Sequence, residues 1–181
     1  MIRLFAALSL PDDLRARLAA LGGGIDGARW VGLENLHITL RYIGEVSEPV
    51  ADEIVYALGT VRAEPFSVTL AGAGHFESRG RPRAVWVGVK ESVDLVALHD
   101  QINRALIRSG LPPEGRKYTP HITIGRLKDA RHSRVPRWLE TNGTFFAPAF
   151  EIFDFILYES RIGRKGSSYL PIAQYPLFNT P

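Results

Sequence analysis

Two short stretches of the sequence carry the same pair of polar residues. The runs LHITL and PHITI place His37 two positions before Thr39 and His121 two positions before Thr123. A histidine can donate or accept a proton near neutral pH, and a threonine offers a hydroxyl group. Two imidazoles on opposite sides of a substrate suit paired acid and base catalysis, and two hydroxyls can hold anionic oxygens. These residue types therefore point to a phosphodiester, which has one attacking and one leaving oxygen.

Other chemistries fit these residues less well. The chain contains no cysteine, which excludes disulfides, zinc–cysteine sites and thiol nucleophiles. No metal is predicted, because threonine is a poor ligand and no dense set of ligands occurs, and a Gly-x-Ser-x-Gly nucleophile is absent. A single His-x-Thr pair would favour a hydrogen-bonded strand residue without a catalytic part, whereas two in matched settings favour function. His75, His99 and His132 lack such a setting and are expected to be surface or structural residues.

The elements that must position these residues are strands. Apolar and aromatic residues surround each histidine, which is typical of a β-strand. Residues two apart point to the same face of a strand, so His37 projects with Thr39, and His121 with Thr123. If two related lobes bring these faces together across a cleft, four polar side chains converge on one pocket.

The remaining pattern interleaves strands with helices and shows no long linker. Helices are predicted over 11–21, 47–59, 93–109 and, more briefly, 133–140. Strands are predicted over the first ten residues, 35–44, 66–72, 83–90, 116–127, 150–160 and 167–178, with 161–168 as a mobile basic loop. The apolar start is read as a buried first strand and not as a signal peptide, because PDD follows it at once.

The composition is that of a globular protein with a modest positive charge. Of the 181 residues, 45% are hydrophobic and 23% are charged, and the formal net charge is +3. Basic residues cluster at 79–83 and 161–165, where they could follow an RNA backbone, although a solvated basic face is the commoner explanation for any one cluster. We expect a monomer without a membrane partner, located in the cytoplasm, where the lack of cysteine is compatible with reducing conditions.

Several longer stretches together resemble one family. RLFAALSLP, NLHITLRYIGEV, GAGHF, RPRAVWVGV, YTPHITIGRLK and YLPIAQYPL occur in this order along nearly the whole chain. They resemble the 2H phosphoesterase superfamily and, within it, the RNA 2',3'-cyclic phosphodiesterase or 2'-5' RNA ligase-like branch. The resemblance implies an α+β fold with pseudo-two-fold symmetry, in which two mostly antiparallel sheets with outer helices flank a central cleft. Residues 1–181 would then form a single domain of two intertwined lobes.

The resemblance also implies an activity and its residues. The expected reaction is hydrolysis of an RNA-terminal 2',3'-cyclic phosphate to a 2'-phosphomonoester without metal or cofactor, on RNA ends or on nucleotides that carry this group. Its functional residues correspond to His37, Thr39, His121 and Thr123. We predict that His121 acts as the base on water and His37 as the acid toward the 3'-oxygen, although symmetry makes these two roles interchangeable.

Three other functions remain open from the sequence. The same family includes 2'-5' RNA ligases, so joining of tRNA halves is one alternative, but water is far more abundant than RNA 5'-ends. A non-catalytic nucleotide-binding module is another, which would not need two proton carriers. A different cyclic phosphate, or action as an RNA-end exonuclease, is the third.

Further substrate contacts are predicted from two arginines and several aromatic residues. Arg126 matches the family's arginine three positions after the second threonine, and a bulge at Gly125 would turn its side chain into the cleft. Arg41 shares strand parity with Thr39 and should point toward the cleft. The possible stacking platforms for a base are Phe5, Phe76, Tyr118 and Tyr169, whereas Trp86 is expected in the core. For each residue, a surface or packing role is the simpler alternative.

Overall fold

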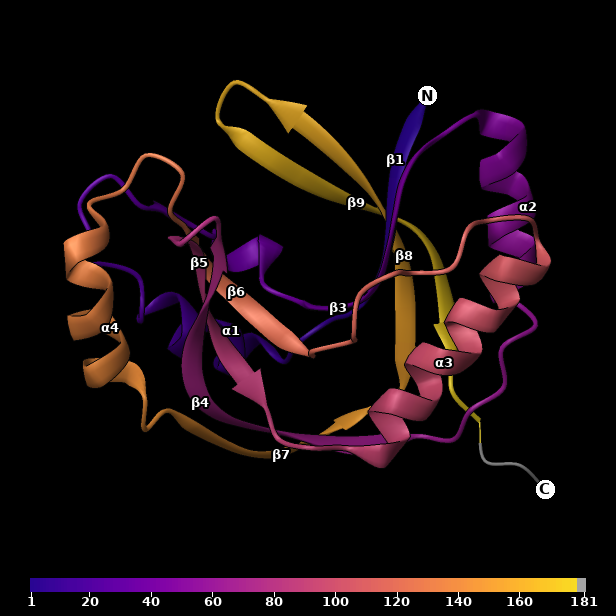
Figure 1. The fold of residues 1–181 in the computed structure, drawn as a ribbon. Coiled ribbons are helices and arrows are strands. Elements are labelled where there is room, and N and C mark those ends of the chain that lie inside the picture. The colour runs from indigo at the N-terminus through magenta and orange to yellow at the C-terminus, as the bar shows by residue number, and fades with distance from the viewer. Residues whose placement is uncertain (179–181) are drawn as a thin grey trace.

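The computed structural model describes residues 1–178, which contain nine strands and four α-helices (Figure 1). The strands are β1 (Ile2–Leu8), β2 (Arg29–Trp30), β3 (Ile38–Val46), β4 (Phe66–Ser78), β5 (Arg81–Val89), β6 (His121–Arg126), β7 (Phe146–Ile152), β8 (Asp154–Gly163) and β9 (Gly166–Pro176). The helices are α1 (Asp12–Ala19), α2 (Glu48–Leu58), α3 (Val93–Arg108) and α4 (Val135–Asn142).

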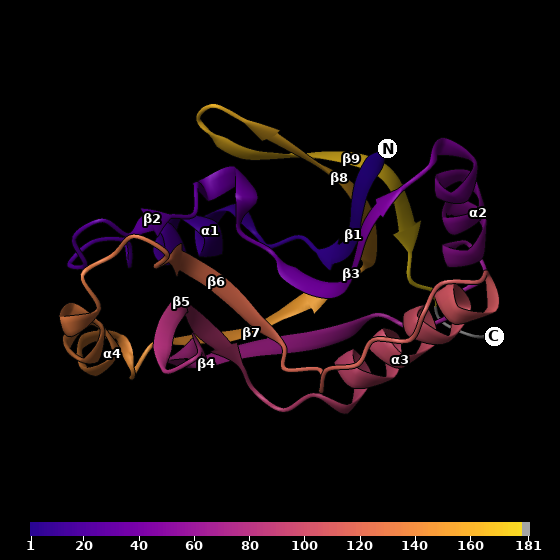
Figure 2. The same cartoon turned by 45° about the horizontal axis from the view of Figure 1, so that its top comes forward.

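The strands form two antiparallel sheets. One has four strands in the order β3-β1-β8-β9, and the other has five in the order β2-β6-β5-β4-β7. One histidine strand, β3, is at the edge of the first sheet, and the other, β6, is inside the second. The two sheets meet where β3 and β6 approach each other (Figure 2). The predicted α+β fold with two mostly antiparallel sheets is confirmed.

The helices gather at the two ends of the molecule. Figures 1 and 2 place α1 and α4 at the end with the five-stranded sheet, and α2 and α3 beside the four-stranded sheet. The longest helix, α3, begins at Ser92, whose hydroxyl accepts a hydrogen bond from the amide of Leu95 at 3.2 Å, as expected of an N-cap. Its apolar face is buried as predicted. No helix of residues 1–178 is long and apolar enough to cross a membrane.

The prediction of a buried first strand is confirmed. Residues 4–8 of β1 are almost fully inaccessible, because β1 is an inner strand of its sheet, paired with β3 on one side and β8 on the other. This strand carries Phe5 into the space beneath the histidine of β3. The core therefore supports the site directly.

Two expectations for the C-terminal part are wrong. The strand predicted over 150–160 is two strands, β7 and β8, which belong to different sheets and are separated at the exposed residue Phe153. The chain passes between the sheets at this point, and the apolar pattern continues because both strands contribute to the core. The loop predicted over 161–168 is the end of a β-hairpin, in which Gly163 pairs with Gly166.

Candidate active site

Each histidine strand is interrupted by a bulge directly after its threonine. On β3, Thr39 pairs with Ala7 and Arg41 pairs with Ala6, so one extra residue, Leu40, lies between them. On β6, the positions that pair with neighbouring residues of β5 are 123 and 125, so residue 124 is the extra one. A bulge inverts the alternation of side chains beyond it. The residue three positions after each threonine therefore shares the face of the histidine and the threonine.

One pocket of about 250 Å³ collects these side chains. Strand β3 contributes His37, which immediately precedes it, together with Thr39 and Tyr42, and β6 contributes His121, Thr123 and Arg126. The rest of the lining consists of Arg3, Phe5, Val31, Asn35, Ser160, Ser167 and Tyr169. The structure thus brings both His-x-Thr pairs to one pocket between the sheets.

Both imidazoles are oriented by the main chain. Nδ1 of His37 lies 2.7 Å from the carbonyl oxygen of Asn35, and Nδ1 of His121 lies 2.7 Å from that of Thr119. A carbonyl oxygen only accepts, so each Nδ1 carries the hydrogen and each Nε2 is left for other partners. Nε2 of His37 lies 3.0 Å from the hydroxyl oxygen of Thr39. In both histidines, a hydrogen bond to the carbonyl two residues earlier therefore fixes the tautomer.

Burial lowers the pKa of both histidines. The pKa of His37 falls from 6.5 to about 4, first because burial penalises the charged ring, and further because Arg126, His121 and Arg15 repel a positive charge there. Its hydrogen bond to Asn35 offsets part of this effect. Burial also lowers the pKa of His121, again with an opposing contribution from its main-chain bond. Both rings are therefore poised as neutral bases until an anion enters the pocket.

Aromatic rings pack against each imidazole. The ring centroid of Phe5 lies 5.0 Å from that of His37, and Tyr169 meets His37 edge-on at 5.3 Å. Phe76 meets the ring of His121 edge-on at 4.7 Å. Phe5 lines the pocket as predicted, but it is only 4% exposed and lies against Tyr169 as well. Its position supports the His37 ring more than it offers a free face to a base.

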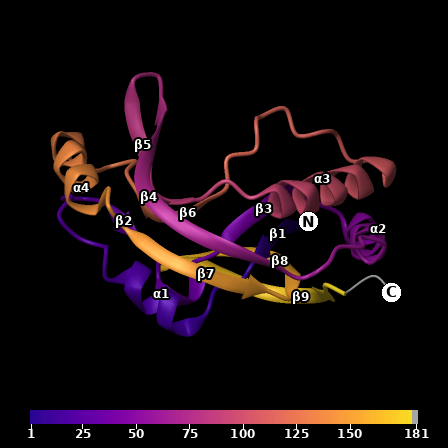
Figure 3. The ribbon, with the colours of Figure 1, turned by 90° about the horizontal axis from the view of Figure 1, so that it is seen from below.

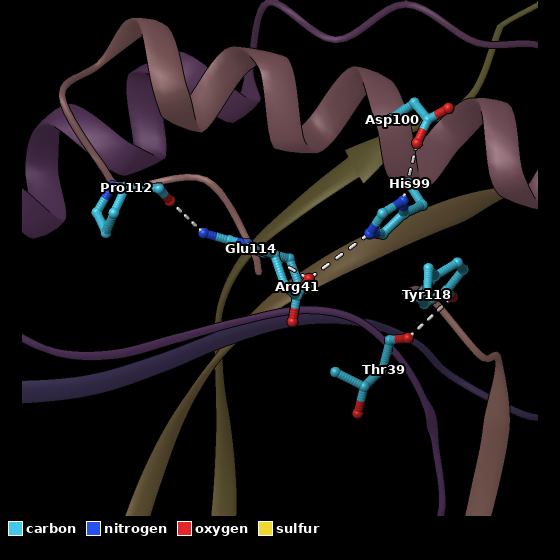
Figure 4. A network of polar contacts seen from close by, with 7 residues as sticks. All are labelled: Thr39, Arg41, His99, Asp100, Pro112, Glu114 and Tyr118. Atoms are coloured by element: carbon cyan, nitrogen blue, oxygen red, sulfur yellow. Dashed lines mark hydrogen bonds and ion pairs between the residues drawn. The ribbon is translucent and has the colours of Figure 1, made fainter. Parts of the chain in front are cut away.

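The structure places the two arginines differently: Arg126 lines the pocket, whereas Arg41 does not. Arg126 lines the pocket, and the bulge that turns it there lies at Ile124, one residue before the predicted position. The prediction that Arg41 points toward the cleft is wrong, because the bulge on β3 turns it away. Arg41 is 5% exposed, and it donates a 2.6 Å hydrogen bond to the carbonyl of Pro112 and forms an ion pair with Glu114 at 3.3 Å (Figure 4).

Tyr118 belongs to the same network of polar contacts as Arg41 (Figure 4). Its ring stacks on His99 at 3.9 Å between centroids, and its hydroxyl donates to the carbonyl of Thr39 at 3.0 Å (Figure 4). Nε2 of His99 lies 3.6 Å from the carboxylate of Glu114. Tyr118 therefore contacts the main chain of the site, not the central pocket. Phe76 also lies outside that pocket, and both rings line a neighbouring groove.

Comparison with known proteins shows which sequences and folds this chain resembles. Residues 10–159 match the family described as the 2'-5' RNA ligase superfamily. This chain is 41% identical over 138 residues to an RNA 2',3'-cyclic phosphodiesterase of Aeropyrum pernix, and the matched region spans 75% of this chain and 78% of that protein. It is 32% identical to the protein of the same name from Archaeoglobus fulgidus, over 93% of this chain and 96% of that one. The crystal structure of E. coli LigT complexed with 3'-AMP matches with a TM-score of 0.82 and 29% identity, covering 98% of this chain and 99% of LigT.

The chain belongs to the 2'-5' RNA ligase superfamily. The sequence of this superfamily member predicts the histidines and threonines of the pocket but not Tyr42, Arg3 or the polar residues contributed by other segments. Tyr42 stands three positions after Thr39, just as Arg126 does after Thr123, and this repeated spacing was the signal that could have found it.

The polar residues from other segments have no such signal. Asn35 precedes the strand, and its side-chain amide donates to the carbonyl of Ser167 at 2.6 Å, which ties the β8–β9 hairpin to the site. Ser160 and Ser167 come from that hairpin, which the sequence analysis read as partly a loop. Among residues 1–178 of this superfamily member, no three His, Asp or Glu side chains are grouped to hold a metal ion.

Proposed function

We propose that this protein hydrolyses the 2',3'-cyclic phosphate of RNA ends or nucleotides to a 2'-phosphomonoester by paired histidine catalysis without a metal ion. The observation that carries the proposal is the convergence of both His-x-Thr pairs and Arg126 in one pocket. The names of the relatives from Aeropyrum pernix and Archaeoglobus fulgidus support RNA cyclic phosphates as the substrate class.

The phosphate is held by donors from both lobes. The hydroxyls of Thr39 and Thr123 and the guanidinium of Arg126 line the same pocket and suit the non-bridging oxygens. While His37 is neutral, the Thr39 hydroxyl donates to its Nε2. Once His37 is protonated, Nε2 becomes a donor and the hydroxyl proton is free to turn to a phosphate oxygen. Protonation of His37 and the hydrogen bond from Thr39 to the phosphate are therefore coupled.

The reaction needs one neutral and one protonated imidazole. Because the pKa of each histidine is lowered, both rings are neutral near pH 7 before an anion arrives. A bound phosphate offsets the repulsion by Arg126 and raises both pKa values, so the pair takes up one proton with the substrate. The neutral ring then accepts a proton from the attacking water, and the charged ring gives its proton to the 3'-oxygen as the bond from phosphorus to that oxygen breaks.

The order of the two roles can be tested separately. The sequence predicts His121 as the base and His37 as the acid, and burial lowers the pKa of both rings, so the two orders need a chemical test. Both orders give the same bell-shaped pH profile. A cyclic substrate with sulfur in place of the bridging 3'-oxygen separates them, because a thiolate leaves without a proton. The alanine variant of the acid histidine should recover activity on this substrate, and the variant of the base should not.

The central experiment is turnover of 2',3'-cyclic AMP in the presence of EDTA, with the product assigned by phosphorus NMR. We expect a 2'-phosphate from the wild type, and a rate lower by about 10²–10⁴ for each of His37→Ala and His121→Ala. His75→Ala is the matched control, because His75 lies outside the pocket and pairs with Glu77. Binding without turnover would instead support a nucleotide-binding module, and loss of activity with EDTA would contradict metal independence.

A further inference from the structure

A second groove opens beside the central pocket and shares part of its wall. It has a volume of about 440 Å³ and includes Thr39, Tyr42 and His121, which also line the central pocket. Its other walls come from the β4–β5 hairpin and from the segment between α3 and β6. Figure 3 shows these two segments projecting from the same side of the molecule. A ligand in the central pocket can therefore extend past His121 into the groove without leaving the protein surface.

The groove carries uncompensated positive charge. Arg83, Arg116 and Lys117 line it, are exposed, and have no ion-pair partner among residues 1–178. Of the two acidic side chains of the groove, Glu114 is paired with the guanidinium of Arg41, and Glu77 is engaged by the imidazole of His75. Glu77 lies 2.8 Å from His75, and Glu114 lies 3.3 Å from Arg41. Three free cations in one groove favour a polyanion.

The floor of the groove next to His121 is aromatic. Phe76 meets the His121 ring edge-on, and the ring centroids of Phe76 and Trp86 are 5.3 Å apart, so these two contacts hold the Phe76 ring in place. Both residues are partly exposed. Ordered aromatic rings beside free cations are the combination that proteins use to bind single-stranded nucleic acid, because bases stack on the rings while the cations contact the backbone.

We propose that this groove binds the nucleotide on the 5' side of the cyclic-phosphate end, so that the enzyme acts on RNA strands in preference to cyclic mononucleotides. The inference rests on the proposed function of the central pocket. A strand that ends in a cyclic phosphate continues only on its 5' side, so it leaves the pocket in one direction.

The other basic surface near the pocket is the end of the β8–β9 hairpin. There Arg161 is engaged by both carboxylate oxygens of Glu159, at 3.0 and 2.9 Å, and Arg164 and Lys165 line neither the pocket nor the groove. The geometry therefore directs the strand along the β4–β5 hairpin and away from the β8–β9 hairpin.

The sequence supplies a matched pair of variants for this test. The tripeptide Gly-Arg-Lys occurs once at 115–117, in the groove wall, and once at 163–165, in the β8–β9 turn. The groove variant is Arg116→Ala with Lys117→Ala, and the control is Arg164→Ala with Lys165→Ala. Both remove two exposed, adjacent cations of the same types. The substrates are 2',3'-cyclic AMP and a short oligoadenylate that ends in a 2',3'-cyclic phosphate.

The groove variant is expected to lower kcat/KM for the oligonucleotide roughly fivefold, at about a factor of two to three for each exposed ion pair. Its slope of log kcat/KM against log salt should become shallower by about 1.4, or about 0.7 for each lost phosphate contact on a single strand. Turnover of 2',3'-cyclic AMP should stay at the wild-type rate, as should both activities of the control variant.

Other results would contradict either the groove proposal or the proposed function. A larger loss for the control than for the groove variant would overturn the proposal and place the strand on the β8–β9 hairpin. Equal effects on the oligonucleotide and on 2',3'-cyclic AMP would also overturn it, because the groove would then act on the pocket and not on the strand. A wild type that does not turn over 2',3'-cyclic AMP or the oligonucleotide would reject the proposed function itself. Charge-retaining Arg116→Lys should keep most of the oligonucleotide activity if the contact is to phosphate.

Discussion

The lowered pKa of His37 makes the stability of the fold depend on pH in a calculable way. In the unfolded chain this histidine has a pKa of 6.5, and in the folded protein about 4, because burial and the nearby Arg126 disfavour the charged ring. The unfolded chain therefore binds the proton more readily. The contribution of His37 to stability is fully present above pH 6.5 and is lost as the pH falls toward 4.

The size of the effect follows from the two pKa values. A difference of 2.5 units (6.5 − 4) corresponds to about 3 kcal/mol when the ring is fully protonated in both states. Between about pH 7.5 and pH 5, where most proteins remain folded, linkage gives a loss of about 2 kcal/mol in the free energy of unfolding. His121 adds a loss of the same sign, since burial lowers its pKa too.

Urea denaturation of the wild type and of His37→Asn at several pH values isolates this contribution. Asparagine keeps an amide donor near the Asn35 carbonyl but cannot take up a proton. The free energy of unfolding of the wild type should fall by about 2 kcal/mol more than that of the variant over this range. Equal pH dependence in the two proteins would refute the assignment of a buried, hard-to-protonate imidazole at this position. Saturating nucleotide should reduce the wild-type pH dependence, because a bound anion favours the protonated ring.

Three further predictions concern single side chains around the pocket. Arg126→Ala should keep the wild-type free energy of unfolding but lower kcat/KM for 2',3'-cyclic AMP about a hundredfold, and an unchanged value would contradict a role in phosphate binding. Arg41→Ala should lower the free energy of unfolding in urea by about 2 kcal/mol, because it removes the charged hydrogen bond to the Pro112 carbonyl and the ion pair with the exposed Glu114, and an unchanged free energy would show that water replaces these contacts. Tyr118→Phe should lower the free energy of unfolding by about 1 kcal/mol, because it removes the hydrogen bond to the Thr39 carbonyl. The expected fall in Tm is about 2–4 °C, and an unchanged Tm would show that water replaces this bond.

The sequence was sufficient where a property depends on neighbouring residues along the chain. The alternation around His37 and His121 correctly placed each with its threonine on one face, and the apolar stripe of α3 predicted the buried face of that helix. These patterns are local because a strand repeats every two residues and a helix about every 3.6. The interleaving of strands with helices followed from these patterns, and the two-sheet architecture followed from the family resemblance.

The errors arose where the partner strand decides the outcome. The bulge at Leu40 is defined by the pairing with β1, in which two neighbouring residues of β1 lie opposite three residues of β3. No residue type within β3 predicts it. Strict alternation therefore assigned Arg41 to the pocket and overlooked Tyr42. The break at Phe153 is of the same kind, because it marks the point at which the chain changes sheets. Register and sheet membership are set by residues far away in sequence.

The side chain that follows each His-x-Thr pair on the same face differs between β3 and β6, and this difference makes the pocket asymmetric. If the surroundings of the two His-x-Thr pairs were identical, a small anion could lie in the pocket in two equivalent ways. Tyr42 on one strand and Arg126 on the other remove this equivalence, because a phenol and a guanidinium occupy corresponding positions. Exchanging them, as Tyr42→Arg with Arg126→Tyr, would reverse the charge asymmetry on an otherwise unchanged frame. Under the proposed function, the position of the Arg126 guanidinium would then decide which imidazole faces the departing sugar oxygen.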